Sequence, residues 1–347
     1  MSAYPALKRL KIPWELTISD SLLGYSMRIA EAKPFLDEHL GTPQELELLR
    51  NAKVRAVTYS NQIEGNKLGE NEVTAVLEGK RIAGSKKDIR EVKNYHDALN
   101  YAARLADDTR PLRLADMCDL QRLVTNGLIE PRQSGGVRTI PVSIINSTTG
   151  ETIDSCPEPH ELPDLLSDLW RWLDATRDMN PFTRAFAFHF IAVSIHPFAD
   201  GNGRTARLMQ HLLLLQTGQR LARFVPSETA IMRRRENYYL AIRQSRSLGR
   251  LDPVVEFLAE CFASSAAEVV EKGRKLLRES AGRTPEVRQR RILANALKQA
   301  DFSMKDVAVW MPNVPRRTLE RDLAALVQKR MLGAKGRLKG RRYQRKK

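Results

Sequence analysis

The sequence has 347 residues, 42% hydrophobic and 28% charged, with 57 Lys+Arg against 41 Asp+Glu. This composition excludes a chain that is disordered throughout, and the length predicts about two or three domains. Leu212–Leu215, the longest apolar run near the middle, is far shorter than the ~20 residues that span a bilayer. The three cysteines are too far apart to indicate a zinc site or a disulfide framework. We therefore expect a cytoplasmic protein without a membrane partner.

The first 110 residues predict a mainly helical region. Thr42, Pro43 and Glu45 form a helix start, with Thr42 as the N-cap and Pro43 at the first helical position. A second helix is expected from Glu70 to near Gly79, and a third from about Ile89 to Leu105.

The segment Gly135–Pro159 differs from its surroundings, because it is rich in β-branched residues and contains the turn sequence Ser147–Gly150. It predicts a β-hairpin inserted between helices. Apolar periodicity and helix-start residues predict five further helices. They cover Glu161–Ala175, a segment that begins at Asn180-Pro181, Arg204–Leu215, Glu228–Arg246 and Pro253–Arg278.

The last part of the chain carries most of the net charge of +16. Residues 283–347 hold 19 Lys+Arg and 5 Asp+Glu, a balance of +14, so the first 282 residues carry only +2. Such an asymmetry favours a polyanionic partner, most of all nucleic acid. A solubilising tail without a partner is the alternative.

Helices are expected over Val287–Ala300, from a capping box at Ser303, and over Val314–Leu326, followed by a short glycine-containing hairpin with Gly333, Gly336 and Gly340. This order resembles a winged helix-turn-helix. Arg316, Arg317 and Arg321 would then lie on a DNA-recognition helix, and Arg341 and Arg342, with Arg337 and Lys339, would contact phosphates from the wing. A domain used for docking or dimerisation is the other interpretation.

The most specific segment of the chain is His196–Arg207, which reads HPFADGNGRTAR. One helix is expected to end near Ile195 and another to begin near Asn202. Between them, Gly201 and Gly203 let free backbone N–H groups point outward at the positive end of the second helix. That arrangement predicts an anion site.

The charged residues of this segment fit a phosphate-containing ligand. Arg204 and Arg207 are three positions apart, so both reach one helix face and could hold two phosphates. Asp200 could bring Mg²⁺ to those phosphates, and His196 could take a proton from a hydroxyl. Alternatively, the segment only joins two helices and His196 packs in the core.

The segment matches the Fic family pattern HxFx(D/E)GNGRxxR at every defined position. The resemblance implies a helical fold and transfer of a nucleotide, usually AMP from ATP, to a protein hydroxyl. It further implies that His196 is the general base, that Asp200 is the Mg²⁺ ligand, and that the hairpin at 136–153 is a flap that aligns the target chain by strand addition. The nucleotide-binding residues that it implies are Gly201, Asn202, Gly203, Arg204, Thr205, Ala206, Arg207, Tyr238 and Tyr239.

Ser60–Asn66 reads SNQIEGN and resembles the inhibitory motif (S/T)xxxE(G/N) of that family, here with Ser60, Glu64 and Asn66. A pair between Glu64 and Arg207 would occupy the guanidinium that should receive the γ-phosphate of ATP. Glu64 could instead position water to remove AMP from a modified target, or simply mark the end of a helix.

The sequence therefore predicts a mainly α protein with three regions: a helical region over 1–110 with the inhibitory motif, a catalytic core with following helices over 111–282, and a basic winged-helix-like domain over 283–347. The leading hypothesis is an adenylyltransferase that uses ATP and Mg²⁺, modifies a Ser, Thr or Tyr hydroxyl of a protein or of itself, is restrained by Glu64 and binds DNA. A nucleotide-sensing DNA-binding transcription regulator and an enzyme that mainly removes AMP are the alternatives. Assembly into a homodimer stays open.

Overall fold

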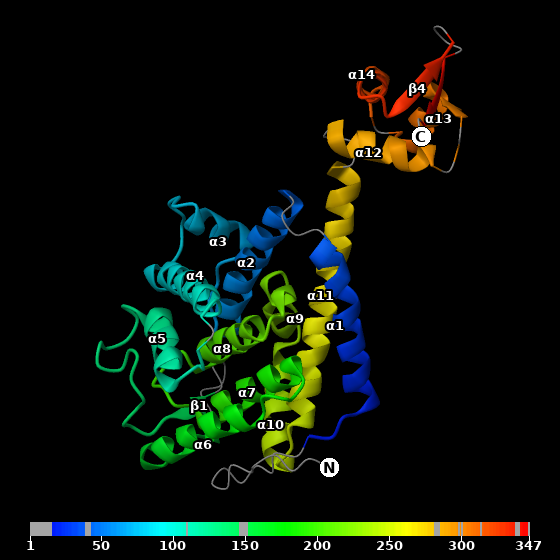
Figure 1. Cartoon of the computed structure of the whole chain (residues 1–347). Helices are drawn as coiled ribbons and strands as arrows, with labels where there is room; N and C mark the ends of the chain where they lie inside the picture. Colours follow the sequence, from blue (N-terminus) through cyan, green and yellow to red (C-terminus); the bar gives the residue numbers. More distant parts are fainter. Residues whose placement is uncertain are drawn as a thin grey trace. The chain divides into compact units, whose positions relative to one another are not determined.

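A computed structural model describes residues 16–38, 43–108, 110–145, 152–280, 285–297, 299, 301–312, 314–336 and 341–345. The chain divides into two compact units, Met1–Val270 and Glu271–Lys347 (Figure 1). Helices make up most of both units, as predicted from the sequence. In the described ranges, no helix combines the length and the apolar character needed to cross a membrane.

The first unit begins with helices α1 (Asp20–Glu38), α2 (Pro43–Ile63), α3 (Glu70–Leu77), α4 (Lys86–Leu105) and α5 (Leu114–Thr125). The predicted starts at Pro43 and Glu70 are confirmed, whereas the cap Thr42 lies outside the described residues. Helix α4 begins before the predicted Ile89, because the Ser85 hydroxyl accepts a hydrogen bond from the Asp88 N–H at 2.9 Å and caps the helix there.

The centre of the first unit is the pair α7 (Pro181–Ile195) and α8 (Asn202–Gln216), which pack against each other. Helix α8 also contacts α2, α4 and α5, so it has protein on several sides (Figure 1). Asn180 caps α7, since its Oδ1 accepts hydrogen bonds from the N–H groups of Phe182 and Thr183 at 3.0 and 3.2 Å. The segment between α7 and α8 is thereby held between two buried helices.

The first unit also contains helices η1 (Pro159–Glu161), α6 (Leu162–Ala175), η2 (Arg220–Arg223), α9 (Glu228–Arg233) and α10 (Arg235–Leu248). Helix α11 (Asp252–Ser280) begins in the first unit, and its last residues belong to the second. The prediction of one helix over Glu228–Arg246 is wrong, because the chain breaks at Arg234, where φ is −125° and ψ is 39°. The Arg234 guanidinium contacts Glu260 Oε2 at 2.8 Å and donates to Cys261 Sγ at 3.2 Å. These contacts with α11 outweigh local helix propensity.

The predicted hairpin is present as strands β1 (Ser143–Ile145) and β2 (Thr152–Ser155), which pair antiparallel. It is shorter than the segment Gly135–Pro159 from which it was predicted, and the turn Ser147–Gly150 lies outside the described residues.

The second unit contains α12 (Pro285–Ala296), β3 (Asp301–Ser303), α13 (Met304–Trp310), α14 (Arg316–Gln328), β4 (Leu332–Lys335) and β5 (Arg342–Arg345), with the antiparallel strand order β3-β5-β4. The predicted capping box at Ser303 is confirmed, since the Ser303 N–H donates to Asp306 Oδ2 at 2.7 Å. The helix predicted over Val287–Ala300 begins earlier, at Pro285, and ends at Ala296, and strand β3 was not predicted. Arg337, Lys339 and Gly340, assigned to the hairpin from the sequence, lie outside the described residues.

Candidate functional site

The segment that joins α7 to α8, which we call the motif loop (residues 196–203, including the first two residues of α8), is fixed by left-handed backbone at two positions. His196 ends α7 with φ 52°, and Gly201 precedes α8 with φ 79°. The Asn202 side chain closes the loop: its Oδ1 accepts from the Phe198 N–H at 2.9 Å, and its Nδ2 donates to the Phe198 carbonyl at 2.8 Å. Both ends of the Asn202 amide are thus engaged in closing the loop.

Two glycines of this loop leave room for close neighbours. A Cβ at Gly201 would lie 3.0 Å from Thr125 Cγ2, in addition to the strain of its positive φ. A Cβ at Gly203 would collide with Glu64 Oε1. The Glu64 carboxylate therefore lies directly against the Gly203 backbone, at the end of α8 where N–H groups are free and the helix dipole is positive.

His196 is held in its neutral form. Its Nδ1 is 3.3 Å from the Val193 carbonyl oxygen, and since a carbonyl only accepts, Nδ1 carries the proton and Nε2 keeps its lone pair. Burial is the main cause that lowers the pKa of His196, to about 4, and the charges of Arg246 and Arg138 add to it, against the opposing effects of Val193 and Glu64. The imidazole is therefore neutral at pH 7.

The two arginines of α8 are buried, with Arg204 3% and Arg207 2% exposed. Arg207 Nη2 contacts Glu64 Oε1 at 2.8 Å and the Ser60 carbonyl oxygen at 2.9 Å, and its Nε donates to Ser60 Oγ at 2.8 Å. Burial alone would raise the pKa of Glu64, but the charges of Arg207 and Arg204 outweigh it and lower that pKa. The pair that the inhibitory motif implied is thus present in the structure.

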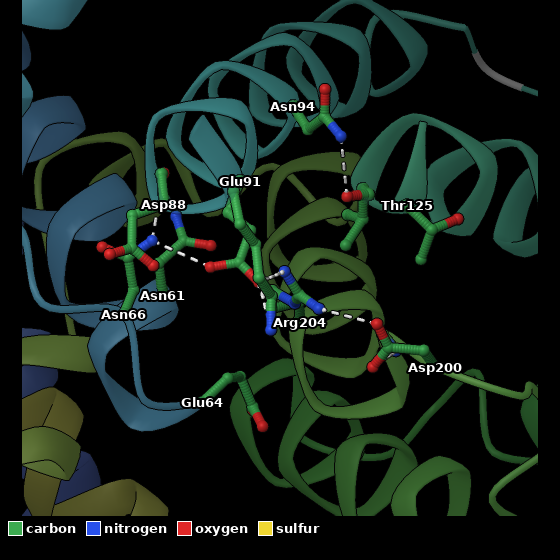
Figure 2. Close-up of polar contacts among 12 residues, drawn as sticks. Asn61, Glu64, Asn66, Asp88, Glu91, Asn94, Thr125, Asp200 and Arg204 are labelled. Atoms are coloured by element: carbon green, nitrogen blue, oxygen red, sulfur yellow. Dashed lines mark hydrogen bonds and ion pairs between the residues drawn. The ribbon is translucent and has the colours of Figure 1, made fainter. Parts of the chain in front are cut away.

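Arg204 belongs to a second network that sequence reasoning missed (Figure 2). Its Nη1 is 3.3 Å from Glu91 Oε1, its Nη2 is 3.3 Å from Asp200 Oδ2, and Asn66 Nδ2 donates to Glu91 Oε2 at 2.8 Å. The turn after α2, helix α4 and the motif loop are connected by these contacts. A signal existed in the sequence: Glu91 lies at helical spacing with the buried Tyr95, so a carboxylate interrupts an apolar face.

The donors that remain unused suit phosphate oxygens. Arg204 Nε and Arg207 Nη1 are buried and have no hydrogen-bond partner among the described residues. The free backbone N–H groups at the start of α8, next to Gly203, form what we call the anion cradle. Together with this cradle, the two unused arginine donors fit the phosphates of a nucleotide.

Asp200 is the acidic residue of the motif loop that could hold a cation. Its Oδ1 accepts from the Gly201 N–H at 2.7 Å, and its backbone carbonyl accepts from Gln121 Nε2 at 3.0 Å. The described ranges contain no group of three or more His, Cys, Asp or Glu side chains that could hold a metal ion. A lone carboxylate fits Mg²⁺ that takes its other ligands from phosphate and water.

The two tyrosines that the resemblance assigned to the nucleotide lie in different environments. Tyr238 is 2% exposed, and its hydroxyl is 2.7 Å from His189 Nε2. Tyr239 is only partly buried, and the Arg235 guanidinium lies 5.4 Å from its ring centre. Arg235 also donates to the Ile63 carbonyl at 2.8 Å, which ties α10 to the end of α2. Thr205 and Ala206 are fully buried in α8.

The basic residues predicted to contact DNA differ in whether they already form an ion pair within the protein. Arg316 pairs with Glu320 at 3.0 Å, and Arg342 pairs with Asp301 at 2.5 Å. Arg317, Arg321 and Arg341 are exposed on the second unit.

Residues 111–214 match the model of the Fic/DOC family. This chain contains a Fic domain. It is similar to the protein adenylyltransferase fic-1 of Caenorhabditis briggsae, with 30% identity over 219 residues, and to the protein adenylyltransferase Fic of Culex quinquefasciatus, with 30% identity over 217 residues. Each match covers 61% of this chain and 40% of the relative, so the chain spans about two fifths of the length of these curated relatives.

Solved structures show the same likeness. A Fic family protein from Desulfovibrio desulfuricans G20 matches with a TM-score of 0.67 and 26% identity, covering 96% of this chain and 98% of that one. The likeness therefore extends into both units. Residues 134–508 of Fic-1 from C. elegans match at a TM-score of 0.59 and 23% identity, covering 73% of this chain and 74% of that one, which shows a shared fold.

Replacement of Asn202 by Ala in the Fic domain should lower the free energy of unfolding by about 1–3 kcal/mol, because two buried backbone groups of Phe198 lose their partners. Urea denaturation of the full chain measures the change. Asn237→Ala, at an exposed position of α10, is the control and should change the value by less than about 0.5 kcal/mol. An Asn202→Ala protein as stable as this control would contradict the role of Asn202 in closing the loop.

Proposed function

We propose that this Fic protein is a protein adenylyltransferase that transfers AMP from ATP to a Ser, Thr or Tyr hydroxyl and that Glu64 restrains it. The observation that carries the proposal is a neutral, Nδ1-protonated His196 on the same loop as an anion cradle with two buried arginines. The names of the curated relatives, both protein adenylyltransferases, support the same activity.

In the proposed reaction, His196 Nε2 accepts the proton of the target hydroxyl as its oxygen attacks the α-phosphorus of ATP. The bond from the α-phosphorus to the bridging oxygen of the β-phosphate breaks, pyrophosphate leaves, and His196 later releases its proton to solvent. The N–H groups at the start of α8, with Arg204 and Arg207, would stabilise the phosphate charge. Mg²⁺, bound through Asp200, would supply charge neutralisation and orientation of the phosphates.

Glu64 would restrain this reaction by occupying the place of an anion. Its carboxylate contacts Arg207 at 2.8 Å and lies against Gly203, where a phosphate would otherwise be bound. With Arg207 engaged, the γ-phosphate lacks its partner, so the α-phosphate would not be aligned for attack.

Labelled ATP tests the activity and its restraint together. Glu64→Gly should raise self-labelling by about 10²-fold, because misalignment of reacting groups typically costs that much. His196→Ala added to Glu64→Gly should lower labelling by ~10²–10⁴-fold. Glu47→Gln, which removes an exposed charge from α2, the helix that precedes Glu64, is the control and should label as the wild type does.

Labelling that survives His196→Ala would contradict the role of the base. No labelling by any variant, with ATP still bound, would favour the nucleotide-sensing alternative. Lower labelling in Glu64→Gly together with faster loss of AMP from a labelled target in the wild type would favour AMP removal.

The pH dependence of transfer should reveal the low pKa of His196. With a pKa of about 4 the imidazole stays neutral down to pH 5.5, whereas an ordinary histidine would lose about tenfold of its neutral form between pH 7.5 and 5.5. We expect initial labelling rates of Glu64→Gly to change by less than about twofold over this range at saturating ATP. Because Glu64 raises the pKa of His196, its removal in this variant lowers that pKa further, and the imidazole stays neutral over the same pH range. A tenfold fall would contradict a neutral base.

We also propose that the second unit binds duplex DNA through a winged-helix-like arrangement. The support is the +14 balance of residues 283–347, the helix α14 beside the β4–β5 pair, and the exposed Arg317, Arg321 and Arg341. Arg316 and Arg342 already pair with Glu320 and Asp301 on the surface, so they are weaker candidates for phosphate contacts.

Titration of the full chain with a labelled duplex at several salt concentrations tests this proposal. Arg341→Ala should weaken binding to all sequences and reduce the log–log salt slope by about 0.9, the value of one phosphate contact. Arg317→Ala should instead reduce discrimination between sequences, if Arg317 reaches a base edge. Arg342→Ala, which removes a paired arginine, is the matched control and should have a smaller effect. No binding at low salt would favour docking or dimerisation.

A further inference from the structure

Arg138 connects the flap hairpin to the motif loop through a single guanidinium. The residue is 5% exposed. Its Nε donates to the His196 carbonyl at 2.8 Å, its Nη1 to the Ile140 carbonyl at 3.0 Å, and its Nη2 to the Pro157 carbonyl at 2.6 Å. Its own backbone N–H donates to the Pro197 carbonyl at 2.9 Å.

These acceptors belong to three separate segments. Ile140 lies on the chain that leads into β1, and Pro157 lies on the chain that leaves β2, so both legs of the hairpin are bound. His196 and Pro197 belong to the motif loop. A rotation of the hairpin relative to His196 would therefore break several hydrogen bonds of one buried side chain.

Burying an arginine at position 138 is energetically unfavourable, so we expect it to have a role that an apolar side chain could not fill. Every hydrogen bond given above ends on a neutral carbonyl oxygen, and burial lowers the pKa of the Arg138 guanidinium. The charge of Glu158 acts in the opposite direction and is outweighed by burial. Neutral acceptors return less than the hydration energy that a buried cation loses. An apolar side chain could fill the same space, but it could not hold three carbonyl groups in fixed directions.

Of the carbonyl groups that Arg138 binds, that of His196 is the most important, because its orientation is coupled to the backbone of the proposed base. His196 has a left-handed backbone, φ 52°, which costs about 1–2 kcal/mol for a residue other than glycine. Arg138 binds the carbonyl of this strained residue, and from α10 Arg246 Nη2 donates to the Val193 carbonyl at 3.1 Å, the same oxygen that His196 Nδ1 contacts. The backbone of His196 is thus held by Arg138, and the carbonyl that its ring contacts is also bound by Arg246.

We propose that Arg138 is a positioning residue that sets the flap and His196 in register, so that a target chain paired with the flap presents its hydroxyl to His196 Nε2. This inference rests on the proposed function, since it assigns Arg138 a part in bringing target and base together. It acts through His196 and the hairpin and does not itself touch the reacting atoms.

The first test does not depend on activity: an NMR pH titration of His196 in the full chain. The charged groups that face His196 are Arg138, Arg246 and Glu64. Arg138→Met removes one of the two cations and frees the carbonyl, so the pKa of His196 should rise by at least about half a unit. Arg138→Lys keeps the charge and should shift it less. Arg184→Met is the matched control, since Arg184 also donates to a carbonyl, that of Leu173, at 2.6 Å and from the first turns of α7.

The second test measures self-labelling with labelled ATP in the Glu64→Gly background. Both Arg138→Met and Arg138→Lys should lower the maximal rate by about 10–100-fold, because a shift of about 1 Å between target and base has this effect. The KM for ATP should stay within about twofold, since the cradle of α8 is unchanged. Arg184→Met should change neither value.

A His196 titration that is the same in Arg138→Met and Arg184→Met, with equal labelling rates, would overturn the proposal. A raised KM for ATP with an unchanged maximal rate would also overturn it, because Arg138 would then serve the nucleotide site. If Glu64→Gly shows no labelling at all, the proposed function fails, whereas the titration still decides the placement of His196 by Arg138. Should Arg138→Met not fold, the labelling rate of Arg138→Lys decides.

Discussion

Two buried guanidinium groups at the positive end of a helix need anions, and this electrostatic requirement shapes the site. Arg204 and Arg207 lie in the first turns of α8, where the helix dipole already disfavours positive charge. Without a carboxylate or a phosphate nearby, burying either one would cost several kcal/mol. The chain supplies Glu64 to Arg207, and Glu91 and Asp200 to Arg204. In the proposed enzyme, self-restraint and nucleotide affinity therefore have the same cause, which is that the buried arginines must be paired with negative charge.

The two glutamates meet this demand in different ways. The Glu91 side chain is 8% exposed and is held by Asn66 at 2.8 Å, so it is a permanent partner of Arg204 (Figure 2). The Glu64 side chain is 32% exposed and lies in the turn after α2, next to Gly65 with φ 98°. A partly exposed ion pair on a turn is easier to open than a buried one on a helix. Glu64 is thus the anion that a phosphate could displace, whereas Glu91 would remain in place beside it.

Local signals were sufficient for much of the fold and for the centre of the site. Helices α2 and α7 begin at the prolines that predicted their starts, the apolar periodicity from Glu70 predicted α3, and the composition of the motif loop predicted a turn before a helix at Asn202. What the sequence could not supply were contacts between distant segments. The break at Arg234 depends on Glu260 and Cys261, and Arg138 depends on carbonyl groups of three segments. Backbone acceptors leave no trace in side-chain patterns, so Arg138 had no signal, whereas Glu91 did have one.

The backbone of His196 shows where the protein tolerates strain. Among the described residues, only His196 and Arg330 are residues other than glycine with a positive φ. Glycine would adopt the conformation at 196 without cost, so a histidine there needs a reason beyond packing. Hydrogen bonds from Arg138 to the His196 carbonyl and from Asn202 to Phe198 offset the strain and keep the loop in one shape. The proposed base supplies the reason: only an imidazole at this position combines a fixed Nδ1 proton, held by Val193, with a free Nε2 at neutral pH.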